Sequence, residues 1–196
     1  MNYIIGLTGG IASGKSTASE YIRSKGYPVL DADIYAKKAT AQDGPTYKGI
    51  LDHFGEDIAG PDGEIDRRKL GAIIFNDPEK RQILNGLVHP EVRRMMNEDK
   101  ERLSRESHVF LDIPLLFENE LDEQCDLTAT VYVDEETQKK RLMDRDGFTE
   151  EEAVSRIRSQ MPLSDKRDRS DVVFQNSGSI QELRGQIQSF LDKIEK

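Results

Sequence analysis

The sequence predicts an α/β fold in which a five-stranded parallel sheet lies between two layers of helices. Five short apolar runs, rich in β-branched residues, alternate with segments of helical periodicity along the 196 residues. Near-continuous apolar strands separated by helices are typical of a parallel sheet that is buried on both faces. A glycine-rich phosphate-binding pattern directly after the first run narrows this class to a three-layer P-loop fold.

The predicted strands are the five apolar runs, and turn residues or helical patterns separate them. The runs comprise residues 3–8, 28–32, 108–113, 127–133 and 171–175. A final helix follows the fifth run, because apolar residues recur at steps of three and four from Ile180 to Ile194. Ser179 stands directly before this helix and is expected to cap it.

The strongest motif follows the first strand. Gly9, Gly14, Lys15 and Ser16 match the P-loop pattern, with an apolar strand before it and a helical segment after it. Glycines let backbone N–H groups turn toward phosphate oxygens, and the helix N-terminus adds the positive end of its dipole. Lys15 is expected to reach the β- and γ-phosphates, and the Ser16 hydroxyl to bind Mg²⁺. Nucleotide contacts are therefore expected from Gly10, Ile11, Ala12, Ser13, Gly14, Lys15, Ser16 and Thr17.

A P-loop alone does not identify the reaction. The sequence lacks the Asn-Lys-x-Asp motif with which GTPases read guanine, and motor or AAA-type ATPases normally need longer chains with sensor motifs. A small-molecule kinase needs less: an acid that supports the metal, a base for the acceptor hydroxyl, an acceptor pocket, and arginines that close over the phosphoryl group. The chain contains candidates for all four.

Two aspartates stand at the carboxyl end of the second strand, in the sequence LDAD. Ligands of parallel α/β sheets bind at this edge, so a carboxylate there can accept the proton of an attacking hydroxyl. We assign this role to Asp33. The alternative is structural, because Asp33 precedes IYAKKA and could cap that helix, while Asp31 could cap a helix or support Mg²⁺.

Two longer segments interrupt the alternation of strands and helices. Residues 34–106 are mostly helical in character and too long for an ordinary crossover, so we expect a helical insertion that binds the acceptor. Residues 141–167 are expected to form a small lid, in which Thr149 and Glu152 make a capping box at the start of a short helix. The nucleotide-binding core is then left with residues 1–33, 107–140 and 168–196.

Asp112 ends the apolar run VFLD and resembles the acid of a Walker B strand, which holds Mg²⁺ directly or through water. Pro114 then stops strand pairing. The sequence LLFE carries Phe117 to the rim of the sheet, where its ring is either a core residue or a ligand contact. The sequence leaves open whether Asp31 or Asp112 contacts the metal.

Three arginines in the predicted lid are candidates for phosphate contacts. Arg141 and Arg145 share one helical face if QKKRLMDR is a helix, and Arg156 follows them. The planar guanidinium gives bidentate contacts to phosphoryl oxygens, which suits a lid that closes over ATP. The alternative is ion pairing with nearby acids, namely Asp144, Asp146 and the glutamates at 150–152.

Composition excludes several classes of function. The chain has 28 Lys and Arg against 37 Asp and Glu, a net charge of −9, which argues against extended nucleic-acid binding. The longest apolar stretches are too short to cross a bilayer, and no secretory signal is evident. The single cysteine, Cys125, cannot form an internal disulfide. We expect a cytoplasmic globular protein, monomeric or a small homo-oligomer, without nucleic-acid or membrane partners.

Taken together, these features resemble the dephospho-CoA kinase family. The matching segments occur in the expected order over nearly the whole chain, and they are GLTGGIASGKS, DAD, HPEVRR, DIPLLFE, RLMDRDG, RIRSQMPLSDK and FQNSGS. The P-loop and the combination of PLLFE with HPxVR are the specific ones. The resemblance implies a P-loop kinase fold and phosphorylation of the 3′-hydroxyl of the ribose of dephospho-CoA, with ATP and Mg²⁺.

The resemblance also implies roles for individual residues. Asp33 matches the family's proposed base, Lys15 and Ser16 match phosphate and metal contacts, and Arg141 matches the lid arginine that reaches the phosphates. Asn176 is expected near the adenine of ATP. The remaining expected contacts are Arg145 for the nucleotide and His89, Arg93, Leu115, Phe117 and Arg156 for the substrate.

Some of these assignments have alternatives. The His89–Pro90 pair is equally plausible as a helix boundary. Ser170 stands where the family pattern has Ala, a departure expected to affect packing only. A kinase for a nucleoside, a nucleoside monophosphate or a sugar acid, and a nucleotide-dependent switch, are the competing functions, and the sequence does not decide between ATP and GTP.

Overall fold

The computed structural model describes residues 1–75 and 77–196. Its chain divides into two compact units, the first comprising Met1–Val29 with Arg102–Lys196 and the second comprising Leu30–Glu101. Among the described residues, no helix has both the length and the apolar character that crossing a membrane requires.

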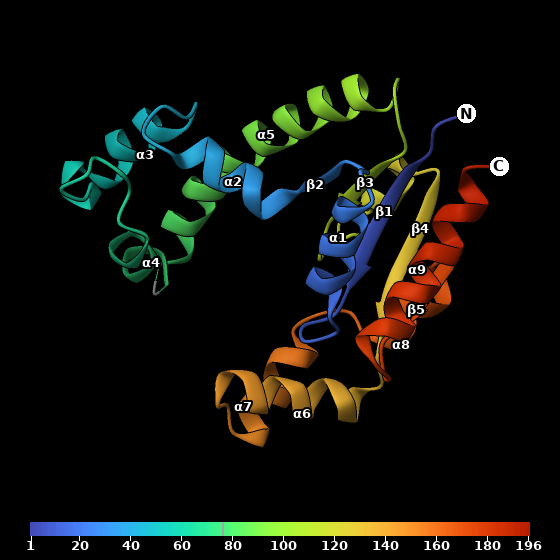
Figure 1. Ribbon diagram of the computed structural model, residues 1–196. Coiled ribbons are helices and arrows are strands. Elements are labelled where there is room, and N and C mark those ends of the chain that lie inside the picture. Colours follow the sequence, from blue (N-terminus) through green and yellow to red (C-terminus); the bar gives the residue numbers. More distant parts are fainter. Residues whose placement is uncertain (76) are drawn as a thin grey trace. The chain divides into compact units, whose positions relative to one another are not determined.

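Five strands form one sheet in the spatial order β2-β3-β1-β4-β5 (Figure 1). Strand β1 pairs in parallel with β3 and β4, and β4 pairs in parallel with β5. The predicted five-stranded parallel α/β sheet is confirmed. The strands are β1 (Ile4–Gly9), β2 (Val29–Asp31), β3 (Val109–Asp112), β4 (Leu127–Tyr132) and β5 (Val172–Gln175).

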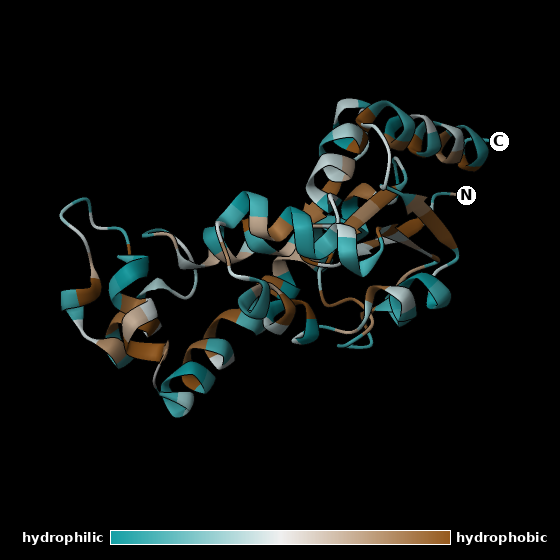
Figure 2. Ribbon diagram, turned by 90° about the horizontal axis from the view of Figure 1, so that it is seen from below, coloured by the Kyte–Doolittle hydropathy of each residue, from teal (hydrophilic) through white to brown (hydrophobic). Residues whose placement is uncertain are grey.

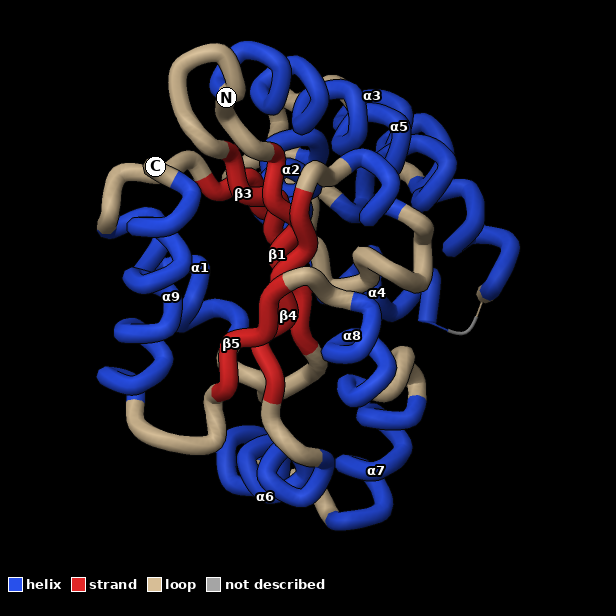
Figure 3. The backbone as a smooth tube through the Cα atoms, turned by 90° about the vertical axis from the view of Figure 1, so that its right-hand side faces the viewer, coloured by secondary structure: helices blue, strands red, loops and turns tan. Residues whose placement is uncertain are grey.

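Helices cover both faces of the sheet within the first unit (Figure 3). Helices α1 (Lys15–Ser24) and α9 (Ile180–Ile194) pack against each other on one face, and α8 (Leu163–Arg169) packs against β1 and β4 on the other. Helices α6 (Glu135–Asp146) and α7 (Glu150–Arg158) follow β4 and pack as a pair (Figure 1). A short 3-10 helix, η2 (Leu121–Gln124), precedes β4.

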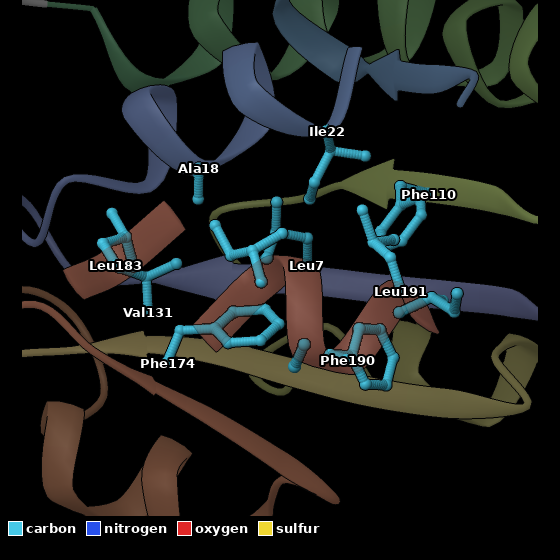
Figure 4. Packing of buried hydrophobic residues seen from close by; sticks show 12 residues of the cluster. Leu7, Ala18, Ile22, Phe110, Val131, Phe174, Leu183, Phe190 and Leu191 are labelled. Atoms are coloured by element: carbon cyan, nitrogen blue, oxygen red, sulfur yellow. The ribbon is translucent and has the colours of Figure 1, made fainter. Parts of the chain in front are cut away.

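The main core lies between the sheet and helices α1 and α9 (Figure 4). Ile5 and Leu7 point to the same face because alternate residues of a strand share a face, and both are fully buried with Ile22 and Leu183. Burial of one such side chain contributes about 1.5–3 kcal/mol. Figure 2 shows strongly hydrophobic strands beside a C-terminal helix that alternates between teal and brown, the pattern of an amphipathic helix over a buried sheet.

The two predicted helix starts in this unit are confirmed. Ser179 accepts a hydrogen bond from the backbone of Glu182, whose side chain accepts one from the Ser179 backbone, so α9 begins with a complete capping box. Thr149 and Glu152 make the same pair of hydrogen bonds at the start of α7. These caps satisfy N–H groups that a helix leaves without intrahelical partners.

The described residues of the second unit form mainly helices, together with the end of β2 and an isolated antiparallel bridge between Ala59 and Ile65. The Tyr35 hydroxyl of α2 donates a hydrogen bond to Asp99 of α5, and the Thr46 hydroxyl donates to the Ala39 carbonyl at 2.7 Å, ahead of α3. Ile50 is fully buried, so the unit has a small core of its own. Its elements are α2 (Ala32–Thr40), α3 (Tyr47–Phe54), the 3-10 helix η1 (Glu56–Ile58), α4 (Arg67–Phe75) and α5 (Pro78–Leu103), whose last residues belong to the first unit.

Candidate active site

The glycine-rich loop joins β1 to α1, and its backbone requires glycine at a defined position. Ala12 and Gly14 have φ values of 58° and 90°, in the left-handed region that turns the chain sharply. A Cβ atom at Gly14 would lie 2.1 Å from the side-chain nitrogen of Asn176, so the position has neither the dihedral angle nor the space for another residue. The loop is closed by a hydrogen bond of 3.1 Å from the Ser13 N–H to the Gly10 carbonyl.

The N-terminus of α1 is placed to bind an anion. Gly14 is its N-cap, and among the residues that the structure describes no side chain caps this helix. The N–H groups of its first turn, those of Lys15, Ser16 and Thr17, therefore lack the acceptor that a cap would give them. Uncapped N–H groups and the positive end of the helix dipole favour phosphate oxygens at this point.

Lys15 and Asp112 form an ion pair beside the loop. Asp112 is the last residue of β3, next to Leu7 of β1 in the sheet, and is 2% exposed. Its other carboxylate oxygen accepts a hydrogen bond of 2.5 Å from the hydroxyl of Ser19, one turn along α1 from Lys15. A buried carboxylate needs such partners, because an unpaired buried charge is strongly unfavourable.

The residues present suit a magnesium ion that arrives with a nucleotide. Ser16 is exposed in the first turn of α1, one residue after the partner of Asp112. No group of three or more acidic, histidine or cysteine side chains that could hold a metal by itself occurs in the described ranges. Mg²⁺ commonly uses one or two protein oxygens and takes its other ligands from water and substrate phosphates, so Ser16 and Asp112 fit this pattern.

An open hollow of about 510 Å³ adjoins the loop. The Asn176 side chain donates to the Ser13 carbonyl at 2.8 Å, and Arg141 donates to the Asn176 carbonyl at 2.7 Å, so the loop, the end of β5 and α6 are joined here. Several sequence-predicted nucleotide residues meet at this hollow, whose lining comprises Ala12, Gly14, Thr17, Arg141, Asp144, Arg145, Asn176, Gly178 and Ile180.

The three arginines of the segment predicted to form a lid have different surroundings. Arg145 lines the hollow and also pairs with its neighbour Asp146 at 2.7 Å, and this hydrogen-bonded pair lowers the pKa of Asp146. The guanidinium of Arg156 stacks over the ring of Phe148 at 4.1 Å and is not part of the hollow's lining. Arg141 contacts a backbone carbonyl instead of an acid.

Helices α6 and α7 lie where the sequence indicated a helical face for Arg141 and Arg145 and a short helix after Thr149. Leu142, Ala153 and Ile157 form a small apolar cluster between these helices. The Lys139 ammonium of α6 donates to Glu150 of α7 at 2.8 Å, and this hydrogen bond lowers the pKa of the Glu150 carboxyl. The two helices therefore form a hairpin with its own core and its own ion pair.

The two substrate contacts predicted in the segment after β3, Leu115 and Phe117, differ in how far they are buried. The ring of Phe117 is only 3% exposed and lies beneath the Arg169 guanidinium at 4.5 Å, so the core alternative describes this residue. Leu115, two residues earlier, is 39% exposed. An apolar strand end followed by LLFE could not distinguish these two positions, because both side chains suit either environment.

Asp31, not Asp33, caps the helix that follows β2. The Asp31 carboxylate accepts hydrogen bonds from the N–H groups of Asp33 and Ile34, at 2.9 Å and 3.4 Å. The capping alternative for Asp33 is therefore wrong, because α2 begins at Ala32, two residues earlier than IYAKKA suggested. Asp33 lies in the first turn of α2 with an exposed side chain.

His89 and Arg93 are both exposed on the long helix α5, four residues apart and thus on one face. The alternative that His89 and Pro90 mark a helix boundary is wrong, since Pro90 lies inside this helix. A proline removes one hydrogen bond from a helix interior, but it ends the helix only where neighbouring contacts fail to hold the turns together.

Sequence reasoning missed several residues that touch the loop. Ser19, which contacts Asp112, was missed as well, and at the loop itself the side-chain oxygen of Gln160 accepts a hydrogen bond of 3.1 Å from the Ile11 N–H. Lys166 donates to the Gly9 carbonyl at 3.3 Å and is fully buried. Both Gln160 and Lys166 lie in RIRSQMPLSDK, so the family resemblance was a signal for the segment but not for these contacts.

A chain with this sheet and this loop belongs to the P-loop nucleotide-binding proteins. The sequence model of the dephospho-CoA kinase family matches residues 3–182, and the chain belongs to that family. The dephospho-CoA kinase of Geobacillus kaustophilus is 49% identical over 100% of both chains. That of Bacillus cereus is 48% identical over 97% of this chain and 96% of its own.

Solved structures agree with this assignment. Dephospho-CoA kinase from Campylobacter jejuni has a TM-score of 0.73 at 28% identity, over 97% of this chain and 96% of its own. A shikimate kinase from Bacteroides thetaiotaomicron has a TM-score of 0.53 at 16% identity, over 98% of both chains, and it shares the fold alone.

Proposed function

We propose that this protein transfers the γ-phosphoryl group of ATP to the 3′-hydroxyl of the ribose of dephospho-CoA, giving CoA and ADP. Membership of the dephospho-CoA kinase family over residues 3–182 carries this conclusion. The glycine loop at the uncapped start of α1 supports it, because the loop offers N–H donors for a triphosphate and the Lys15 ammonium beside them.

Nucleotide binding is assigned to the loop, Arg141, Arg145 and Asn176. The N–H groups of the loop and the Lys15 ammonium would bind the β- and γ-phosphates, while Asn176 would lie near the base. Lys15 would exchange its contact with Asp112 for one with phosphate oxygens. Mg²⁺, held by Ser16 and Asp112 with the phosphates, would neutralise charge on the transferring group.

The acceptor is assigned to the second unit. Asp33 would accept the proton of the ribose 3′-hydroxyl. The 3′ oxygen of the ribose would then form a bond to the γ-phosphorus while the bond from that phosphorus to the ADP oxygen breaks. Because Asp31 is engaged in capping α2, the neighbouring Asp33 is the better candidate for this proton transfer. His89 and Arg93, on one face of α5, are assigned to dephospho-CoA together with Leu115 and Arg156, whereas the buried Phe117 is left to the core.

The chemistry would depend mainly on position and charge. Phosphoryl transfer asks little covalent work of the protein, so oriented donors and exclusion of water supply most of the rate enhancement. The hairpin of α6 and α7, which carries Arg141 and Arg145, is assigned the role of a lid that closes over ATP.

The test is ADP formation with and without dephospho-CoA, with the phosphate position in the product determined by NMR. We expect ADP only with the acceptor, and phosphate on the 3′ oxygen. Adenosine, AMP, shikimate and gluconate serve as competing acceptors, and a kinase specific for dephospho-CoA should prefer it by a large ratio of kcat/KM. ATP binding without acceptor-stimulated turnover would instead indicate a nucleotide-dependent switch.

A further inference from the structure

Lys166 is a buried charge with no role in the reaction proposed above. It lies on α8, and its side chain is 0% exposed. A buried ammonium is tolerated only where its N–H donors have acceptors. The Lys166 Nζ has three, the carbonyl oxygen of Gly9 at 3.3 Å, that of Pro114 at 2.8 Å and Oε1 of Glu118 at 2.8 Å.

These acceptors belong to segments that carry parts of the phosphate site. Gly9 ends β1 and begins the P-loop pattern, and Pro114 follows Asp112 by two residues. The Pro114 carbonyl also accepts a hydrogen bond of 3.1 Å from the Thr8 hydroxyl. One ammonium therefore joins the beginning of the loop to the turn that follows the buried acid.

The Glu118 carboxylate extends this connection to the chain that returns from the lid. The oxygen that pairs with Lys166 also accepts a hydrogen bond of 3.2 Å from the Met161 N–H. Gln160 precedes Met161, and its side-chain oxygen accepts a hydrogen bond of 3.1 Å from the Ile11 N–H of the loop. The segment from 160 to 166 thus contacts the loop at Gly9 and at Ile11.

We propose that Lys166 is a positioning residue for phosphoryl transfer, which holds the start of the P-loop and the turn after Asp112 at a fixed separation. The inference rests on the proposed kinase function and adds a residue outside the nucleotide contacts. It follows from the geometry, since Lys15 and Asp112 must act on the same triphosphate from two different segments. A misplacement of about 1 Å in such an arrangement can lower a rate by about 100-fold.

The experiment compares three variants with the wild-type protein. Lys166→Met removes the ammonium at nearly constant length. Lys166→Met/Glu118→Met also removes the carboxylate, so that no unpaired buried charge is left to destabilise the fold. Arg167→Met is the control, because it removes a positive charge from the same helix, where Arg167 pairs with Asp168 at the surface. Tm, the Kd for ATP by calorimetry and kcat are measured for each.

We expect both Lys166 variants to lower kcat by about 10- to 100-fold and to raise the Kd for ATP by at least about threefold, with Arg167→Met within about twofold of wild type. The double variant should have a higher Tm than Lys166→Met without recovering kcat. Recovery of kcat and Kd to within about twofold by the double variant, or its failure to fold, would assign Lys166 to stability and overturn the proposal. If the wild-type protein shows no turnover, the proposed function fails, and the Kd values still test the position of the loop.

Discussion

The side-chain amide of Asn176 donates a hydrogen bond of 2.8 Å to the carbonyl oxygen of Ser13, across 163 positions of sequence. The backbone carbonyl of Asn176 accepts a hydrogen bond from the Arg141 guanidinium. Asn176 therefore fixes the glycine-rich loop against the end of β5 and connects both to α6. Asn176 thus supports the shape of the loop, apart from the nucleotide contact that we propose for it.

Asn176→Ala should weaken ATP binding and destabilise the fold. The variant leaves the Ser13 carbonyl without its donor, and an unsatisfied buried group costs about 1–3 kcal/mol of unfolding free energy. We expect the KM for ATP to rise by about tenfold because the loop loses its support. Gln175→Ala is the control, since that side chain is exposed in the preceding position. Equal KM values for the two variants would contradict this role of Asn176.

Gly14→Ala should abolish ATP binding, and Gly26→Ala should not. Both glycines have a φ of 90°, but a Cβ at Gly26 has nothing within 4 Å, whereas at Gly14 it would collide with Asn176. Gly26→Ala therefore measures the dihedral strain alone, about 1–2 kcal/mol in a chemical denaturation experiment. We expect Gly14→Ala to lose more unfolding free energy than Gly26→Ala and to bind no ATP by calorimetry. The difference between the two variants measures the steric conflict with Asn176. Retained ATP binding by Gly14→Ala would show that the loop can move away from Asn176.

Ser19→Ala should lower kcat although Ser19 is absent from the predicted contacts. Its hydroxyl orients the carboxylate of Asp112, which we assign to the metal, so its loss should lower kcat by about tenfold and raise the Mg²⁺ concentration for half-maximal rate. Removal of Mg²⁺ with EDTA should abolish turnover in the wild-type protein and in Ser19→Ala, and added Mg²⁺ should restore it. An unchanged Mg²⁺ dependence in Ser19→Ala would leave Ser19 with a packing role only.

The parts of this structure that follow from local chemistry were predictable from the sequence. Apolar runs predicted the five strands. Apolar periodicity after Ser179 predicted the last helix, and Thr149 with Glu152 predicted the start of α7. Capping boxes and strand periodicity depend on neighbours in sequence, so a single chain displays them. Asp31 and Asp33 show the limit, because a shift of two residues in the start of α2 decides which of them is the cap.

Contacts between distant segments were not predictable. Lys166 lies in LSDKRDR, which looks like the solvated surface of a short helix, and its acceptors at Gly9 and Pro114 are 157 and 52 positions away. A buried lysine is rare and its burial has no local signature. For the same reason the sequence could not separate Phe117, which is buried, from Leu115, which is exposed.

Arg141→Met should impair catalysis more than Arg145→Met. Arg145 forms a partly exposed ion pair with Asp146 at 2.7 Å, whereas the hydrogen bond of Arg141 goes to the backbone carbonyl of Asn176. A guanidinium that meets developing charge on the phosphoryl group contributes about 100- to 1,000-fold in kcat, so we expect a loss of that order for Arg141→Met. Arg145→Met should change kcat by less than about tenfold. The reverse order of effects, measured as kcat with saturating ATP, would exchange the roles of the two arginines.

Asp33→Asn should remove most turnover while ATP binding remains, whereas Asp31→Asn should keep most of the turnover. A general base contributes about 100- to 10,000-fold, so kcat of Asp33→Asn should fall by that factor, with the Kd for ATP within about twofold of wild type. Asp31 accepts two N–H groups at the start of α2, and asparagine can retain that cap, so Asp31→Asn should keep most activity. Asp31→Ala should lower the unfolding free energy by about 0.5–2 kcal/mol and leave kcat of the folded protein much less affected than Asp33→Asn does. Full turnover by Asp33→Asn with dephospho-CoA would transfer the role of base to another group, and a collapse of kcat in folded Asp31→Asn would point to Asp31.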